Sequence, residues 1–531
     1  MRFPSKTVLL FCATLALMLA AARAESVYWS DNFETNAGSR WTTNKVWQVG
    51  SPTVGPSANT NGFRTYSGSR CTTTGLKAGA GDNVDSRFIC TNYNGATYLT
   101  VPSADQFPRL RFWQWFSFVN SEGYVEVQVA GSTDWQTISI TNIGIGSTPD
   151  AGGGVWSRPS LDMSAFAGED VQIAFHFTSG PGGWGTDLGW YVDDVALVTN
   201  QPTFNNPEGF EGDSSDWSVD SGTWQIGVPT SGPTLTNGFR AHSGTNCAAT
   251  ILAGNYGWDM DSRLLTPSFI VPATGGEALR FWQWYNFVNA RGFVEITTGD
   301  GTWTTLSQTN QSIGGTATTT FGIWTNTVID LSAYAGQTVQ VAFHFQSGPS
   351  GFSGAPGWYI DDLALIGIPS LTVPPTITIT NGQTFTTTAT ATNYLQPYSQ
   401  FTFAFASRST NAFITTNGLI NWTNTATAPN KTNTLSVKVT DDNLPPFSIT
   451  NSFNVIVWPV YSFIPLNIPA SHSFQLTLGS LTNSNWRIDA STDLVTWLPV
   501  FTNTVPANGH FQFSDTTVTN FPYRFYRPVH Q

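Results

Sequence analysis

Apolar and polar residues alternate along many short stretches of this chain. In the stretches 124–129 and 171–178, every second residue is apolar. A period of two residues is that of a β-strand with one buried face. Clusters of Gly, Pro, Asn and Ser separate these stretches, as is typical of turns. The pattern predicts many short strands, with a short helical turn at 162–166 and another at 330–334.

The alternating pattern belongs to a long internal repeat. The stretch Arg-Phe-Trp-Gln-Trp at 111–115 recurs at 280–284, and Gly-Trp-Tyr-Val-Asp-Asp at 189–194 recurs with one substitution at 357–362. The repeat length of about 170 residues is that of a domain and not of a solenoid unit. Many short strands in a domain of this size predict a β-sandwich or jelly roll.

The repeat and the changes in composition predict the domain organisation. After residue 369 the chain becomes rich in Thr and Asn, with strand-like runs up to residue 458 that suit one immunoglobulin-like sandwich. We predict an all-β chain with these parts: a signal peptide at 1–24, a first jelly roll at 25–200, a second at 201–368, the Ig-like domain at 369–458 and a small antiparallel β module at 459–531.

The N-terminal residues have the features of a secretory signal. Arg2 and Lys6 precede an apolar run from Val8 to Leu19, and Ala22-Arg23-Ala24 fits a cleavage site. No later stretch has 18 consecutive apolar residues, which a membrane-spanning helix needs. We therefore expect a secreted or cell-surface protein that does not span the membrane.

Charge and cysteine content narrow the possibilities further. The formal net charge is -12 and only 11% of residues are charged, which argues against a nucleic-acid partner and is compatible with divalent cations. After signal removal three cysteines remain, so a complete disulfide framework is excluded. Cys71 and Cys90 are the pair expected to form a disulfide. In the alternative reading, all three cysteines, including Cys247, are small buried side chains.

The repeated module resembles a known group of jelly rolls. Its early Phe33-Glu34 and its closing Gly-Trp-Tyr-(Val/Ile)-Asp-Asp-(Val/Leu) are similar to MAM domains and bacterial cleaved-adhesin domains. That resemblance implies adhesion or substrate binding on secreted proteins, with a structural calcium in some members. Residues 371–458 resemble bacterial putative-Ig, cadherin-like modules, and 459–531 resemble a C-terminal module of secreted proteins from Verrucomicrobia-type bacteria.

No sequence motif indicates an enzyme. The chain has no HExxH, P-loop, GxSxG or strand-following GxGxxG motif. Adjacent carboxylates such as Asp193 and Asp194 point to opposite faces of a strand, so they do not form a hydrolase pair. We predict a protein without catalytic activity.

The acidic residues at the start and end of each module are candidate calcium ligands. Calcium prefers several hard oxygen ligands, and the first and last strands of such sandwiches commonly lie side by side. The alternative is that these acids cap turns or pair with arginines. The candidates are Glu34, Asp193, Asp194, Glu211, Asp361 and Asp362.

A polar strand face with tryptophans is the candidate ligand site. Indole rings stack on the apolar faces of sugars while polar groups bind the hydroxyls. The alternation predicts one face of one sheet that carries Arg111, Trp113, Trp115, Glu126, Gln172 and His176 in the first module, and Arg280, Trp282, Trp284, Glu295, Gln340 and His344 in the second. In the alternative reading, the tryptophans belong to the core and the polar groups satisfy one another.

These observations predict a non-catalytic binding or adhesion protein that recognises an extracellular polysaccharide or surface protein. The alternatives are an accessory component of a secreted degradative enzyme system and a structural envelope protein.

Overall fold

The computed structural model describes the chain from Glu25 onward, with gaps. The described residues are 25–35, 40–42, 46–118, 120–139, 142, 155–181, 188–233, 240–273, 276–309, 324–348, 355–380, 382–393, 399–423, 431–442, 446–458, 461–466, 473–480 and 482–531. The signal peptide predicted at 1–24 lies outside them.

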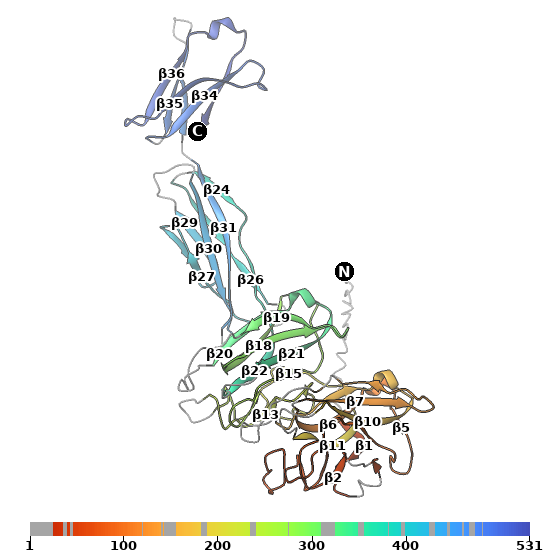
Figure 1. Ribbon diagram of the computed structural model, residues 1–531. Helices are drawn as coiled ribbons and strands as arrows, with labels where there is room; N and C mark the ends of the chain where they lie inside the picture. The colour runs from red at the N-terminus through yellow and green to blue at the C-terminus, as the bar shows by residue number, and fades with distance from the viewer. Residues whose placement is uncertain are drawn as a thin grey trace, which may run out of the picture. The chain divides into compact units, whose positions relative to one another are not determined.

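The prediction of an all-β protein is confirmed. Within the described ranges, the elements are strands and four short 3₁₀ helices (Figure 1). Two of these helices, η2 (Ser164–Phe166) and η3 (Ser332–Tyr334), lie at the predicted helical turns. In the described part of the chain, no helix has the length and apolar character needed to cross a membrane. The chain divides into two compact units, Met1–Leu365 and Ile366–Gln531.

The first module is a two-layer sandwich. Its first sheet has the order β2 (Gln48–Gly50), β3 (Cys71–Thr73), β11 (Gly189–Thr199), β6 (Pro108–Ser117) and β9 (Ser160–Asp162), with β1 (Ser26–Asp31) also paired to β11. Its second sheet has the order β4 (Asp85–Ile89), β10 (Asp170–Ser179), β7 (Ser121–Val129) and β8 (Gln136–Thr137), with β5 (Leu99–Thr100) also paired to β10. As expected, the first and last strands, β1 and β11, are antiparallel neighbours.

The core between the two sheets is aromatic. Phe112 of β6, Phe175 of β10 and Trp190 of β11 are at most 1% exposed, and Phe175 contacts both of the other rings edge-on. The indole nitrogen of Trp190 donates a hydrogen bond to Oε1 of buried Gln114, at 3.1 Å. Trp358 and Gln283 repeat this bond at 3.0 Å, so the two modules share the polar contact inside the core.

The second module repeats the two sheets. One has the order β13 (Gln225–Gly227), β14 (Cys247–Ala249), β22 (Gly357–Gly367), β17 (Glu277–Asn286) and β20 (Thr325–Asp330). The other has the order β12 (Ser218–Val219), β15 (Asp261–Leu265), β21 (Thr338–Ser347), β18 (Ala290–Thr297) and β19 (Thr304–Thr309), with β16 (Phe269–Ile270) also paired to β21.

The second unit contains two further groups of sheets. In the first group, β24 (Ile377–Thr380), β31 (Ser448–Trp458), β30 (Lys431–Thr440) and β27 (Thr402–Ser407) form one sheet, β25 (Thr384–Thr388), β29 (Leu419–Thr423) and β28 (Ala412–Ile414) another, and β23 (Ser370–Thr372) pairs with β26 (Thr390–Thr392). In the second group, β32 (Tyr461–Leu466), β33 (Phe474–Ser480) and β36 (His510–Asp515) form one sheet and β35 (Leu498–Thr504), β34 (Asn485–Ser491) and β37 (Phe525–His530) the other.

The predicted disulfide between Cys71 and Cys90 is wrong. Both residues, like Cys247, are buried free thiols. Cys71 packs with Trp115 and Tyr191 in a cluster of its own, whereas Cys90 belongs to the sandwich core. The two cysteines lie in different layers, and sequence spacing carries no information about that. The alternative reading, three small buried side chains, is the correct one.

We therefore expect the chain that begins at Glu25 to contain three free thiols. Titration with a thiol reagent in denaturant, without reductant, should give three equivalents per chain. Under native conditions it should give about none, because burial raises the pKa of all three thiols, that of Cys90 to about 12. One equivalent in denaturant would show a disulfide and contradict this structure.

Candidate functional site

The outer face of the first sheet is covered by the segment 51–70. The ring of Tyr191 on β11 lies directly beneath Gly55, where a Cβ atom would come within 2.3 Å of the ring, and its hydroxyl donates to the Gly75 carbonyl at 2.7 Å. Cys71 and Trp115 are buried beside Tyr191. Trp284 of the second module is likewise 1% exposed, beside Tyr359. Trp115 and Trp284 are therefore packing residues and not the exposed ligand contacts that the sequence predicted.

A buried carboxylate of β11 holds this segment in place. Oδ2 of Asp193 accepts hydrogen bonds from the backbone N–H groups of Tyr66 and Ser67, at 3.1 and 3.2 Å. The neighbouring Asp194 accepts a hydrogen bond from the Ser67 hydroxyl at 3.1 Å. Adjacent strand residues reach the same loop because the pairing of β11 with β6 shifts register after Asp193, and Asp194 has a φ of 48°. Strand alternation therefore does not hold at this pair.

Glu34 binds the same loop from the other end. Its Oε1 accepts hydrogen bonds from the N–H groups of Ser69 and Arg70, both at 2.8 Å. Although burial opposes it, these bonds hold the pKa of Glu34 below its usual value. Burial, together with the charge of Asp194, raises the pKa of Asp193 to about 8.

The second module repeats this arrangement. Asp361 accepts from the N–H groups of His242 and Ser243, and Glu211 from those of Thr245 and Asn246. Asp362 receives the Ser243 hydroxyl at 2.7 Å and lies 2.6 Å from Nδ1 of His242. The six predicted calcium ligands thus gather at one loop in each module.

The geometry at these acids is that of loop anchors. Most of their oxygens already accept N–H or O–H bonds, with which a calcium ion would compete. Among the described residues, no group of three or more His, Cys, Asp or Glu side chains is arranged to hold a metal ion. Calcium binding stays a prediction.

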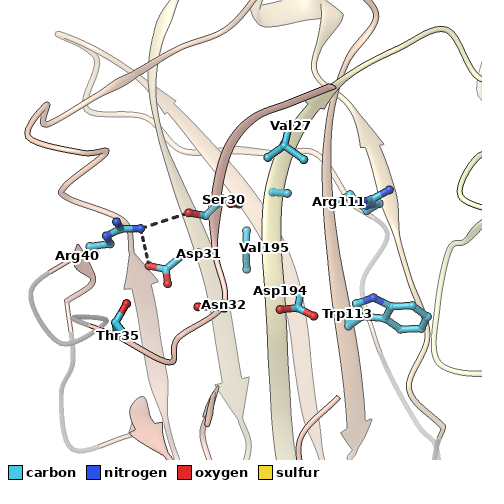
Figure 2. Close-up of a pocket in the computed structure, with 11 residues that line it drawn as sticks. Val27, Ser30, Asp31, Asn32, Thr35, Arg40, Arg111, Trp113, Asp194 and Val195 are labelled. Carbon is cyan, nitrogen blue, oxygen red and sulfur yellow. Dashed lines mark hydrogen bonds and ion pairs between the residues drawn. The ribbon is translucent and has the colours of Figure 1, made fainter. Parts of the chain in front are cut away.

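A pocket of about 510 Å³ opens beside these anchors, between β1 and β6 (Figure 2). Figure 2 shows Arg40 and Arg111 on opposite sides of it, with Asp194 and Val195 between them. The pocket is lined by Val27, Ser30, Asp31, Asn32, Thr35, Arg40, Arg111, Trp113, Asp194, Val195 and Ala196. Two predicted ligand residues, Arg111 and Trp113, and one predicted calcium ligand, Asp194, therefore share one pocket.

The charges around the pocket compensate one another. Asp31 lies 3.6 Å from Arg40, and Arg111 forms an ion pair with Glu25. The lining itself holds two arginines and two aspartates. The pocket therefore offers hydrogen-bonding groups without a net charge.

Trp113 is half-buried and partly covered. The ring of Tyr66 stacks on it at 3.7 Å between ring centroids and 14° between planes. The Arg158 guanidinium also lies over the Trp113 ring, at 5.4 Å. In the second module His242 stacks on Trp282 at 3.9 Å. Trp113 thus offers the pocket part of an aromatic stack and not an open ring face.

The prediction that the six candidate ligand residues of each module share one sheet face is wrong. Arg111 and Trp113 belong to the first sheet, whereas Glu126 of β7 and His176 of β10 belong to the second. The outer faces of the two layers of a sandwich point in opposite directions. Alternation shows which side of each strand is buried, but not which strands share a sheet. The same division separates Arg280, Trp282 and Trp284 from Glu295, Gln340 and His344.

The outer face of the second sheet carries a repeated charge cluster. In the first module Arg87 contacts Glu126 at 2.6 Å, and His176 lies 2.7 Å from Asp85 and 3.2 Å from Glu126. Gln172 donates to a backbone carbonyl instead. Glu126 and His176 are each 4% exposed, so little of either side chain is open to a ligand.

The corresponding cluster of the second module favours a charged histidine. The ring nitrogens of His344 lie 3.1 Å from Glu295 and 2.6 Å from Asp261. Burial lowers the pKa of His344, but these two hydrogen bonds outweigh it and raise the pKa above the usual value. Gln340 donates to the Thr266 carbonyl at 2.8 Å.

Residues from two segments at or beside the pocket were not predicted from the sequence. Tyr66 lies in the covering loop, where nothing in the local pattern marks it as a stacking partner. Arg40, Asn32 and Thr35 come from the turn after β1, where alternation gives no direction. The repeat could have indicated Tyr66, because the aligned residue His242 also has a planar ring in its side chain.

Comparison with known proteins gives partial matches. No family model matches the chain. It is 36% identical over 189 residues to Bacillopeptidase F of Bacillus subtilis (strain 168). The matched stretch covers 34% of this chain and 12% of that protein. It is 32% identical over 117 residues to the pre-pro-metalloprotease PrtV of Vibrio cholerae, or 21% of this chain and 12% of that one. The chain thus spans about an eighth of these curated relatives.

The similar solved structures include a tandem CBM22 domain and a cleaved adhesin domain. The tandem CBM22 domain of Paenibacillus barcinonensis Xyn10C covers 66% of this chain and 99% of its own, with 12% identity and a TM-score of 0.22. The K3 cleaved adhesin domain of Lys-gingipain from Porphyromonas gingivalis covers 31% and 98%, with 19% identity and a TM-score of 0.21. At such TM-scores these likenesses do not identify a ligand.

The His344 cluster should make stability depend on pH. A raised histidine pKa contributes stability that is complete below the unfolded value, near 6.5, and is lost as the pH rises through the folded pKa. His344→Gln should therefore lower the free energy of unfolding by about 2 kcal/mol at pH 5–6, and by less at higher pH. Denaturant unfolding between pH 5 and 9, with exposed His510→Gln as control, measures this. If the free energy of unfolding of His344→Gln falls short of the wild-type value by the same amount at every pH, this prediction is contradicted.

Calcium binding predicts a shift in melting. If the acids bind calcium in the folded state only, a hundredfold excess over Kd adds about 2.7 kcal/mol of stability. The melting temperature should then rise with free calcium in the wild type, and less in Glu34→Gln. Equal melting in calcium and in chelator would reject the site.

Proposed function

We propose that this chain is a secreted or cell-surface binding protein without catalytic activity, which recognises a neutral polysaccharide in the pocket of its first module. The pocket between β1 and β6 is the observation that carries this proposal. Its volume of about 510 Å³ lies in the range of ligand sites.

The chemistry of the pocket suits a hydroxyl-rich ligand. Ser30, Asn32 and Thr35 offer side-chain hydrogen bonds, and Trp113 offers an apolar surface. A sugar combines apolar C–H faces with hydroxyls and fits such a mixture. The balance of two arginines and two aspartates disfavours strongly anionic ligands such as nucleic acid.

The repeat adds an argument for a polymeric ligand. Arg280, Trp282 and Asp362 of the second module occupy the positions of Arg111, Trp113 and Asp194. Two weak sites on one chain gain avidity for a repeating target, provided that both engage. We therefore expect binding to polymeric glycan at concentrations where free monosaccharide shows none.

Pull-down on insoluble cellulose, chitin and xylan, with affinity electrophoresis in soluble glucans and mannans, tests the proposal. Trp113→Ala and Arg111→Ala should each weaken binding about tenfold or more, since each removes a pocket contact. Val27→Trp should block the pocket without removing a buried group, because Val27 is 57% exposed.

The matched control is Trp135→Ala. Trp135 is also half-buried, but it follows β7 on the second sheet, beneath Arg87. It should leave binding unchanged. If Trp135→Ala and Val27→Trp lose polysaccharide binding to the same extent, the proposed pocket is rejected. It is also rejected if the folded wild-type protein binds none of the polymers.

A second candidate is a non-catalytic accessory of a secreted degradative system. It is favoured by the partial match to two proteins named as peptidases, each much longer than the matched stretch. In that case the chain should speed the breakdown of an insoluble polymer by an added hydrolase. If the rate of polymer breakdown stays unchanged at a saturating concentration of this chain, the result argues against this role.

A further inference from the structure

Arg158 links the pocket of the first module to the second module. Its guanidinium lies over the ring of Trp113, and its Nη2 donates to the carbonyl oxygens of Ser214 and Trp217 at 2.9 and 3.4 Å. The backbone N–H of Val219 in β12 donates to the Arg158 carbonyl at 3.1 Å. One residue of the first module is thus held by three backbone groups of the second.

A second link starts from Arg111 on the other side of the pocket. Arg111 pairs with Glu25. Glu25 lies 3.8 Å from Arg109, and Arg109 lies 3.9 Å from Asp216 of the second module. Arg109 and Glu25 are 10% and 13% exposed in their side chains, so solvent screens these contacts only in part. Both links end on the same short segment, Ser214–Trp217.

The repeat shows that these links are particular to the first module. Alignment of the two copies places Ala278 at the position of Arg109 and Asn326 at that of Arg158, whereas Arg111 and Trp113 are matched by Arg280 and Trp282. The register pairs Trp282 with Asn326 across β17 and β20. The second module therefore keeps the counterparts of Arg111 and Trp113 but has no arginine at the positions of Arg109 and Arg158.

We infer that the segment Ser214–Trp217 of the second module is a structural part of the first module's pocket, and that Arg158 is the residue through which it positions Trp113. The guanidinium is planar and stacks on an indole while its edge donates to carbonyls. The carbonyl oxygens of Ser214 and Trp217 hold the guanidinium in its place over the Trp113 ring. This inference rests on the proposed function and names the positioning residue of that site.

The experiment compares Arg158→Ala, Arg158→Lys and Asn326→Ala in the full chain. Asn326→Ala is the matched control, because it occupies the same position in the second module and its Nδ2 has no hydrogen-bond partner. Two properties are measured. One is the affinity for the polysaccharide bound by the wild type. The other is near-UV circular dichroism without any ligand, compared with the difference spectrum of Trp113→Ala, because the chain has 21 tryptophans and that difference isolates the contribution of Trp113.

Arg158→Ala should weaken binding about tenfold, the equivalent of one charge-assisted contact, and should change the near-UV spectrum. Arg158→Lys retains the charge and a donor but not the plane, so it should recover part of the affinity. Asn326→Ala should match the wild type in both measurements. Partial recovery by lysine separates positioning from a general loss of stability.

An unchanged near-UV spectrum in Arg158→Ala overturns the inference whether or not a ligand is known. Wild-type affinity in Arg158→Ala beside lost affinity in Trp113→Ala also overturns it, and leaves the proposed function in place. If the wild type binds none of the polysaccharides, the proposed function fails, and the spectrum alone decides whether Arg158 positions Trp113.

Discussion

The buried carboxylate of Asp193 is the constraint on which the binding surface depends. It sits on β11, with 0% exposure, and accepts backbone N–H bonds from the loop above it. Together with the bonds that Asp194 and Glu34 accept from the same loop, these bonds hold Tyr66 in place over Trp113. The register shift beside Asp193 also turns Asp194 toward the pocket. One irregular point in a long strand therefore shapes both the cover of the sheet and the wall of the pocket.

The same constraint explains why the two modules are similar in shape but differ in chemistry. Asp361 holds the matching loop of the second module in the same way. Because backbone N–H groups make these bonds, the side chains of the loop are free to vary. Tyr66 becomes His242, and the partner of the aromatic stack changes without any change in the scaffold.

Sequence analysis identified the architecture well and the site only in part. Alternation placed Arg111 and Trp113 on the outer side of β6, and the structure agrees because a half-buried strand has a period of two. The repeat identified the module, and the paired arrangement of β1 and β11 follows from the fold that its motifs indicated. Arg111, Trp113 and Asp194 do meet in one pocket.

The errors have a physical origin. Glu126 and His176 were grouped with Trp113 because alternation does not show which strands belong to the same sheet. Strand pairing between distant parts of the sequence determines that. Trp115 was expected to be exposed because alternation places it on the outer side of its strand, but it packs there against Cys71 and Tyr191. Arg158 was overlooked because it binds backbone carbonyls of another module. A pattern of side chains gives no information about such partners.

A crystal structure of the full chain with an oligosaccharide fragment of the polysaccharide that it binds would test the proposed pocket directly. Ligand density is expected between β1 and β6, within hydrogen-bond distance of Arg111 and in contact with Trp113. Density on the outer face of β4, β10 and β7, or only outside the first module, would contradict it.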